Sequence, residues 1–367
     1  MKSRVKRAAV VVIVNSILIV LGILLVELAL GGWIRPDALN RLNIIRSRTI
    51  KLNVGGLYDW PTDIVTYTRD DYGLRGTFQN PSEIDILTVG GSTTDQRFIN
   101  DGYTWQDVIQ QEFREIGKDV VVANAGVDGQ STFGHIANFD WWFPNIPGLK
   151  PKFILFYVGI NDFHVEGASK FDEFLPDAAH PSVRQILRER SVLYHFLRTI
   201  HGAYVARFTY KLAHLARDFS QVGWTTVPLQ PSYEELMSYP LRGFAERLEI
   251  LIRRTRGFGS APIFVTQPTR WYRFRDGVME GTTVQRPYAG LPINGVDYYR
   301  MIRMLDEVMI SVCANENVPC FDMEREIAWE DDDFYDFNHM NPKGARKVGE
   351  YLAGRLMADC PGLLDAH

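Results

Sequence analysis

The chain has 367 residues, of which 46% are hydrophobic and 23% charged, a composition typical of a globular protein with room for one large or two ordinary domains. Four of its 40 basic residues, Lys2, Arg4, Lys6 and Arg7, stand in the first seven positions, which leaves 36 basic against 44 acidic residues in the remainder. This acidic balance argues against nucleic acid as the main partner.

An apolar run covers residues 8–30, with Glu27 as its single charged side chain. About 20 residues suffice to cross a bilayer. A cleaved signal peptide is the alternative, because the small residues Ala29 and Gly31 flank a possible cleavage point, but its apolar part should be only roughly 7 to 15 residues long. The length therefore favours an uncleaved transmembrane anchor that associates the protein with a membrane. Basic residues also follow the span, yet residues 1–7 favour a cytoplasmic N-terminus and an extracytoplasmic (periplasmic or extracellular) catalytic part.

Residues 31–80 lack a strong hydrophobic period and contain turn signals, so we interpret them as a stalk and lead-in to a domain over 81–360. Within that domain, short apolar runs bounded by Gly, Pro or Asn predict buried parallel strands at 84–89, 119–123, 153–158, 261–266 and 318–322. Helical periodicity follows from about residue 105, and again at about 234–256, 296–315 and 342–357.

The first of these helices has signals at both ends. Thr104 can cap its start with Asp107 at the third position, and Gly117 can end it. Strands and helices in alternation predict a doubly wound, three-layer α/β sheet with right-handed connections. Ligands of such sheets bind at the carboxyl ends of the strands, so the chemistry is expected there.

An insertion of about 165–232 separates the third and fourth strands, and it is too long for a simple crossover. Residues 183–218 have apolar positions at helical spacing together with an excess of basic residues, among them Arg188, Arg198, Arg207 and Lys211. Such a basic amphipathic helix suggests contact with an anionic membrane or glycan. The alternative is a cap whose apolar face packs on the core, and both interpretations predict a lid over the site.

Four segments at strand ends carry residues suited to chemistry, at 90–94, 124–129, 159–162 and 336–339. A serine hydroxyl needs a general base, and the chain offers His339 with Asp336 three residues earlier, just before a helix that Asn341 and Pro342 can start. Asp336 can hold one imidazole nitrogen while the other faces Ser92.

An acyl-transfer site also needs hydrogen-bond donors aimed at the developing oxyanion. The backbone amides of Ser92 and Gly129 and the side-chain amide of Asn161 are the candidates. Taken singly, Gly129 is more readily explained as a turn glycine and Asn161 as a helix cap.

Four such pieces in this order resemble the SGNH (GDSL-like) hydrolase superfamily, over roughly residues 84–358. The resemblance implies a flavodoxin-like α/β/α fold with a parallel five-stranded sheet. It also implies a nucleophile at Ser92, oxyanion donors at Ser92, Gly129 and Asn161, a base at His339 and its partner at Asp336. The first block departs from the namesake motif, with Gly91 and Thr93 in place of Asp and Leu, which is similar to a GGS-type variant.

Other chemistries lack their sequence signals. The G-x-S-x-G elbow is missing at Ser92, and neither a G-x-x-x-x-G-K-[ST] loop nor an H-E-x-x-H helix occurs. We therefore expect no metal and no organic cofactor. The acidic run 330–333 offers carboxylates for a cation, but we interpret it as a solvated loop, since such runs are usually exposed. Either all three cysteines, Cys313, Cys320 and Cys360, are buried thiols, or two of them form one disulfide. We assign no chemical role to His214 or to the histidines other than His339.

The expected activity is that of a serine esterase working through an acyl-enzyme. The loop with Arg270, Trp271 and Tyr272 combines aromatic rings with cations and is a candidate substrate contact, although a partly buried Trp with surface arginines fits the same pattern. Acyl groups on a cell-envelope glycan are the first substrate hypothesis, and lipids or small esters the second. An O-acyltransferase using the same site and a non-catalytic envelope-binding protein are the remaining alternatives.

Overall fold

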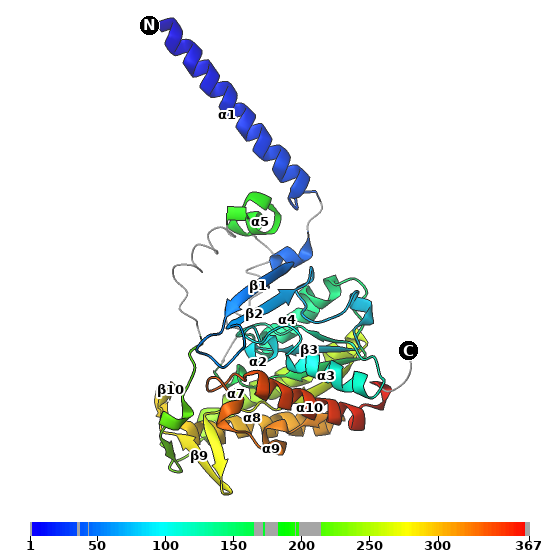
Figure 1. Cartoon of the computed structure of the whole chain (residues 1–367), viewed down its shortest axis with the longest axis vertical. Helices are drawn as coiled ribbons and strands as arrows, with labels where there is room; N and C mark the ends of the chain where they lie inside the picture. The colour runs from blue at the N-terminus through cyan, green and yellow to red at the C-terminus, as the bar shows by residue number, and fades with distance from the viewer. Residues whose placement is uncertain are drawn as a thin grey trace. The chain divides into compact units, whose positions relative to one another are not determined.

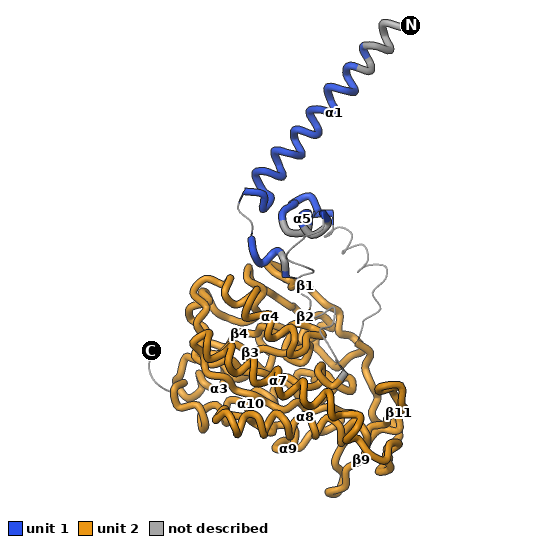
Figure 2. The backbone as a smooth tube through the Cα atoms, turned by 180° about the vertical axis from the view of Figure 1, so that it is seen from behind, with its two compact units in different colours: residues 1–43, 174–213 blue, residues 44–173, 214–367 orange. Residues whose placement is uncertain are grey.

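The computed structural model describes residues 2–34, 37–42, 44–164, 172, 183–194, 196–197 and 214–363. The chain divides into two compact units (Figure 2). One consists of residues 1–43 with 174–213, and the other of residues 44–173 with 214–367.

The smaller unit contains the helix α1 (Lys2–Leu30) and the short helix α5 (Val183–Arg190). Residues Val10–Leu30 are long and apolar enough to cross a membrane, a test that a signal sequence near an N-terminus also passes. The carboxylate of Glu27 accepts hydrogen bonds from Trp33 Nε1 at 2.7 Å and from Ser191 Oγ at 2.6 Å. Much of the expected insertion, including Arg198, Arg207 and Lys211, lies outside the described residues.

The larger unit is built on a parallel sheet, as the sequence predicts. In the described part of the chain, five strands lie in the order β12-β7-β5-β3-β4, and every pair is parallel. Their bounds are β3 Ile86–Gly90, β4 Val122–Asn124, β5 Phe153–Tyr157, β7 Ala261–Val265 and β12 Cys320–Phe321. Strands β3 and β5 have nearly continuous buried residues, which is the pattern of strands covered on both faces.

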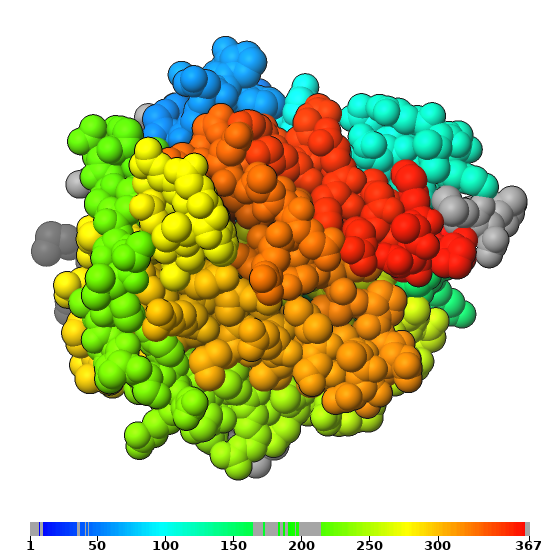
Figure 3. All heavy atoms as spheres, turned by 90° about the horizontal axis from the view of Figure 1, so that it is seen from below, coloured from blue at the N-terminus to red at the C-terminus, as the bar shows by residue number. Residues whose placement is uncertain are grey.

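Two groups of helices cover this sheet (Figure 1). Helix α3 packs on α10, whereas α7 packs on α4 and on α8. The crossover from β3 to β4 runs in one direction along the sheet and the later crossovers run in the other, so right-handed connections place the groups on opposite faces. The bounds are α3 Trp105–Glu115, α4 Thr132–Trp141, α7 Glu234–Phe258, α8 Gly295–Glu316 and α10 Pro342–Asp359. Figure 3 shows the C-terminal part of the chain, orange to red, on the face seen from below.

The predicted cap of α3 is confirmed. Thr104 accepts a hydrogen bond from the backbone N–H of Asp107, the Asp107 side chain accepts one from the backbone of Thr104, and Gly117 follows the helix at a φ of 74°. Helix α10 likewise begins with Asn341 as its cap and Pro342 at its first position. These helices therefore start where local sequence signals indicate.

Smaller elements complete this unit. Residues 44–80, part of the expected stalk and lead-in, contain the antiparallel pair β1 and β2, in which Val65 and Tyr67 are buried. A small sheet orders its strands β6-β9-β8, and a separate pair joins β10 to β11. The remaining bounds are β1 Arg48–Asn53, β2 Ile64–Arg69, β6 Trp224–Thr225, β8 Tyr272–Arg275, β9 Val278–Thr282, β10 Arg286–Tyr288, β11 Leu291–Ile293, α2 Ser92–Asp95 and α9 Met323–Glu326.

Candidate active site

Ser92 stands directly after the carboxyl end of β3, as the first residue of the one-turn helix α2. The turn between them is tight: a Cβ atom on Gly90 would lie 2.1 Å from Thr94 Oγ1 and 2.5 Å from the carbonyl oxygen of Tyr157. Only glycine fits at that position without displacing its neighbours. The sequence therefore presents the serine at the edge of the sheet where ligands of α/β folds bind.

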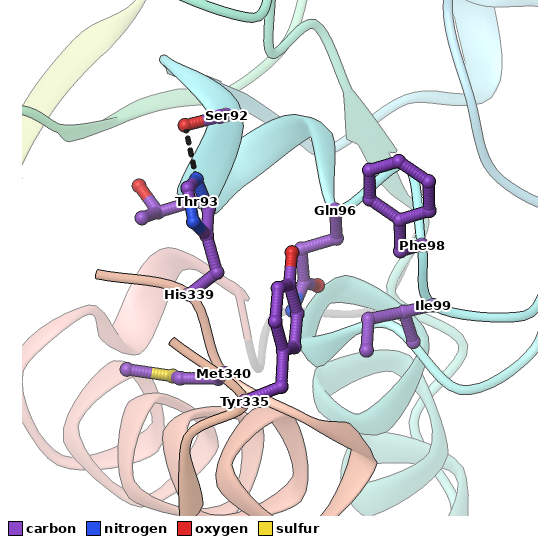
Figure 4. Close-up of a pocket in the computed structure, with 8 residues that line it drawn as sticks. All are labelled: Ser92, Thr93, Gln96, Phe98, Ile99, Tyr335, His339 and Met340. Carbon is purple, nitrogen blue, oxygen red and sulfur yellow. Dashed lines mark hydrogen bonds between the residues drawn. The ribbon is translucent and has the colours of Figure 1, made fainter. Parts of the chain in front are cut away.

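The segment 336–339 forms a turn immediately before α10. Asp336 Oδ1 accepts hydrogen bonds from the backbone N–H groups of Asn338 at 2.8 Å and His339 at 2.7 Å, which fixes the carboxylate against its own turn. His339 Nδ1 lies 2.8 Å from Asp336 Oδ2, and His339 Nε2 lies 2.8 Å from Ser92 Oγ (Figure 4). The three side chains thus form one continuous hydrogen-bonded chain.

The electrostatics of this chain favour an ionised carboxylate. Burial opposes the ionisation of Asp336, but hydrogen bonds from His214 and His339 outweigh it and hold the pKa of the carboxyl well below its ordinary value. A carboxylate that stays charged fixes the proton of the imidazole on Nδ1 and leaves Nε2 able to accept a proton from a hydroxyl.

The candidate oxyanion residues Gly129 and Asn161 lie in the segments that follow two other strands, β4 and β5. Asn161 Nδ2 donates a hydrogen bond to the carbonyl oxygen of Gln130 at 2.9 Å, which joins the segment after β5 to the segment after β4. Gly129, next to that carbonyl, adopts the left-handed conformation at a φ of 74°. The Asn161 amide also lies so close to Gly91 that a Cβ atom there would be 2.1 Å from Nδ2.

A side chain without an assigned role in the sequence links these loops. Gln267, which follows β7 and is buried, donates from Nε2 to Thr93 Oγ1 at 2.7 Å and to the carbonyl oxygen of Tyr157 at 3.1 Å. Its Oε1 accepts from the backbone N–H of Ile160 at 2.8 Å. Gln267 therefore fixes the residue after the serine relative to the residue before Asn161.

A pocket opens beside Ser92 and His339 (Figure 4). It encloses about 250 Å³ of empty space, part of it open to solvent. Its lining is mainly apolar and comes from α2, the loop after it and the segment before α10: Ser92, Thr93, Gln96, Phe98, Ile99, Tyr335, His339 and Met340. The apolar side chains in this lining suit an apolar group of a substrate.

A buried ion pair links α2 to strand β2 of the lead-in segment 44–80. The Arg69 guanidinium forms a salt bridge with Asp95, and Tyr67 donates a hydrogen bond to the same carboxylate at 2.7 Å. Arg69 also donates to the carbonyl oxygens of Asn124 at 2.9 Å and Gly126 at 2.7 Å. Burial opposes the charge of Asp95, but Arg69 and Arg97 outweigh it and lower the pKa of the carboxyl. No periodicity or motif in the sequence indicates this cluster.

His214, which was given no chemical role from the sequence, is a second imidazole at the Asp336 carboxylate. Its Nδ1 lies 3.4 Å from Asp336 Oδ2 and 3.3 Å from the hydroxyl oxygen of Tyr335. Its ring centroid is 4.3 Å from that of His339. Because it is distant in sequence from Asp336, only the folded chain reveals this proximity.

The candidate substrate contacts Arg270, Trp271 and Tyr272 have partners inside the protein. Arg270 is 5% exposed and pairs with Asp331, and Tyr272 is 4% exposed and donates from its hydroxyl to Glu324 at 2.6 Å. Trp271 is 9% exposed and stacks on Phe337 at 4.2 Å between ring centroids. None of the three lines the pocket beside Ser92, and their role as substrate contacts stays a prediction.

In the remaining candidate sites, the acidic run is ion-paired and the cysteines are reduced. In the acidic run, Glu330 and Asp332 contact Lys343 Nζ at 2.7 and 2.8 Å, and Asp333 contacts Lys347 Nζ at 2.7 Å. Lysine ammonium groups thus stand where a cation would bind. All three cysteines are free thiols, with Cys313 and Cys360 buried and Cys320 partly exposed.

Comparisons with known proteins found one family model and several solved structures that are similar to this chain. A model described as the GDSL-like Lipase/Acylhydrolase family matches residues 88–347. No curated protein matches the chain. A psychrotrophic esterase EstA from Pseudoalteromonas sp. is similar at 11% identity and a TM-score of 0.41, over 74% of this chain and 96% of that one. An acetyl xylan esterase, AlAXEase, is similar at 11% identity and a TM-score of 0.41, over 74% of this chain and 100% of that one. The native M. smegmatis aryl esterase is similar at 14% identity and a TM-score of 0.38, over 74% of this chain and 98% of that one.

Proposed function

The chain belongs to the GDSL-like lipase/acylhydrolase family and is an ester hydrolase, and from this premise we propose that it works through a Ser92 acyl-enzyme. The observation that carries the proposal is the 2.8 Å contact between Ser92 Oγ and His339 Nε2. Asp336 completes the set through its 2.8 Å contact with His339 Nδ1.

The reaction proceeds in two steps. His339 accepts the Ser92 proton as Oγ attacks the ester carbonyl, and the imidazolium then protonates the leaving alcohol as the acyl-enzyme forms. In the second step His339 takes a proton from water, the resulting hydroxide attacks the acyl carbon, and Ser92 Oγ leaves with the proton returned by the imidazolium. Asp336 stays ionised throughout and stabilises the imidazolium.

Three donors are assigned to the negative charge on the carbonyl oxygen: the backbone N–H groups of Ser92 and Gly129 and the side-chain amide of Asn161. One Asn161 amide hydrogen is used by the carbonyl oxygen of Gln130, so the second is free for the oxyanion. A donor held by such a bond needs no reorganisation when charge develops.

The substrate we propose is a short acyl ester, an O-acetyl group on a cell-envelope glycan. The apolar side chains of Phe98, Ile99 and Met340 line the space beside Ser92 and support a small acyl group there. Location supports the glycan, because α1 is proposed as an uncleaved anchor with the catalytic unit outside the cytoplasm.

The test uses the full-length chain in detergent with aryl esters of increasing acyl length. Ser92→Ala should abolish hydrolysis and labelling by a fluorophosphonate, whereas Ser238→Ala, which removes an exposed hydroxyl, should change neither. Undiminished turnover by Ser92→Ala would overturn the assignment of the nucleophile.

The assignment of the pocket to the acyl group is tested by the ratio of the kcat/KM values for a long and a short acyl ester. Phe98→Ala should raise kcat/KM for hexanoyl over acetyl esters, and the ratio cancels any effect on the catalytic chain that both esters share. An unchanged ratio would show that the acyl group lies elsewhere. Product analysis with acetylated envelope glycans then separates hydrolysis, which releases free acetate, from transfer of the acetyl group to a second sugar hydroxyl.

A further inference from the structure

The Asp336 carboxylate is contacted by two histidines. Its Oδ2 lies 2.8 Å from His339 Nδ1 and 3.4 Å from His214 Nδ1. Its Oδ1 accepts two backbone N–H groups, from Asn338 and His339. His339 Nδ1 also lies 2.9 Å from Oδ1, so it faces both carboxylate oxygens, and His214 approaches one of them, Oδ2.

The Asp336 carboxylate decides which ring nitrogen of His214 must carry a proton. An ionised oxygen can only accept, so a contact between Asp336 Oδ2 and His214 Nδ1 is attractive only when Nδ1 carries a proton. The Tyr335 hydroxyl, 3.3 Å from the same nitrogen, then acts as an acceptor. His214 is thereby a donor to Asp336 in its neutral Nδ1–H form and also in its charged form.

Aromatic packing holds the His214 ring in this position. Its centroid lies 4.9 Å from Phe98, 5.9 Å from Tyr335 and 4.3 Å from His339. Among the residues that the structure describes, the titratable groups in contact with the ring are Asp336, His339 and Tyr335. Tyr335 is itself buried, which raises the pKa of its phenol, and Asp336, Tyr58, Asp128 and Asp95 raise it further. Tyr335 therefore stays protonated and neutral beside the two histidines.

We propose that His214 is a positioning residue of the catalytic machinery, which shares the Asp336 carboxylate with His339 and so limits how strongly His339 is held as an imidazolium. The inference rests on the proposed function, because it assigns to Asp336 and His339 their roles in acyl transfer. A carboxylate that accepts a second hydrogen bond has less negative charge to offer the imidazolium, so losing that bond should strengthen its hold on His339.

Three variants separate the hydrogen bond from the packing. His214→Phe keeps a ring against Phe98 but has no donor, His214→Asn keeps a donor near the position of Nδ1 but has no ring, and His214→Ala has neither. The measurement is kcat and KM of the full-length protein with an aryl acetate, between about pH 5 and 9. EDTA is present throughout, because His214, Asp336 and His339 lie close enough to hold a metal ion.

His214→Phe and His214→Ala should lower kcat about tenfold with KM little changed, because the Asp336 carboxylate then loses one of the hydrogen bonds that orient it toward His339. They should also move the acid limb of kcat/KM to higher pH by about half a unit or more, because the imidazolium of His339 is then held more strongly. His214→Asn should restore most of kcat and of the acid limb.

Two results would overturn the inference. One is a pH profile of His214→Phe that superimposes on the wild-type profile after scaling, and the other is equal activity of the Phe and Asn variants. Failure of the proposed function has a different signature, since turnover would then survive Ser92→Ala. A protein that loses turnover with Ser92→Ala but keeps its profile with His214→Phe retains the proposed function and rejects this inference alone.

Discussion

The side-chain amide of Asn161 occupies the space that a Cβ atom on Gly91 would need. The ideal Cβ position lies 2.1 Å from Asn161 Nδ2 and 3.3 Å from the carbonyl oxygen of Gln130. The residue before the proposed nucleophile and the proposed oxyanion donor are thus in direct contact. Glycine at this position has a physical explanation here, although the namesake motif of the family has Asp.

Substitution of Gly91 should therefore act on catalysis through Asn161. We expect Gly91→Ala to displace the amide and to lower kcat toward the value of Asn161→Ala, for which the loss of one oxyanion donor predicts about 10²- to 10³-fold. The two changes should be less than additive in the double variant, because they disturb the same donor. Steady-state kinetics with circular dichroism as a folding control measures this, and full additivity would contradict the shared mechanism.

A pH-dependent contribution to stability is expected from Asp162, which is buried beside Arg247 and Thr132. Burial raises its pKa to about 6 from 3.8, although Arg247 and hydrogen bonds from Thr132 oppose this. The folded state then binds more protons than the unfolded state between these values, so this contribution is fully present below about pH 4 and is lost as pH rises through 6.

The test compares the free energy of unfolding of wild type and Asp162→Asn from pH 4 to 7. The wild type should lose on the order of 1 to 3 kcal/mol relative to the variant over this range. Asp140→Asn is the matched control, because Asp140 is exposed and pairs with Arg254 at 2.8 Å on the surface. Its difference from wild type should stay flat. A flat difference for Asp162→Asn as well would contradict the raised pKa.

The Arg69–Asp95 pair should contribute far more to stability than an exposed ion pair on the surface. Asp95→Asn leaves the guanidinium of Arg69 buried without its charged partner, and we expect a loss of about 3 to 5 kcal/mol in denaturant unfolding. Breaking the exposed Arg254–Asp140 pair by Arg254→Ala should cost no more than about 1 kcal/mol. Similar losses for the two variants would show that burial of the first pair has no energetic consequence.

Truncation tests the organisation of the N-terminal part. Full-length protein should remain with membranes after a carbonate wash, whereas a chain starting at Gly32 should be soluble and active, because it lacks the apolar span of α1. A chain starting at Asn80 should be insoluble, since it loses β1, β2 and the buried Arg69. Recovery of only a shortened soluble form from cells expressing the full chain would favour a signal sequence.

The sequence alone was sufficient to predict the layers of the fold and to suggest the three residues proposed for catalysis. Buried apolar runs and helix caps such as Thr104 and Asn341 are local signals, so they indicated the strands and helices directly. Boundaries were least accurate at β4 and β12, predicted at 119–123 and 318–322 but formed by Val122–Asn124 and Cys320–Phe321. Both lie at an edge of the five-stranded sheet, where hydrogen bonds to few partners decide where a strand begins and ends, and for β4 these include an isolated bridge from Asn124 to Arg75.

Only the tertiary structure decided which distant side chains surround that set. Gln267 contacts Thr93 across 174 positions in the chain, and His214 contacts Asp336 across more than a hundred, so no local period or spacing encodes either contact. The loop of Trp271 illustrates the converse: its position after β7 was predictable, but the direction of its side chains was not. Packing against Phe337 and hydrogen bonding to Asn338 turned the Trp271 ring toward the protein, because burying an indole needs a stacking surface and a partner for its N–H that only the folded chain supplies.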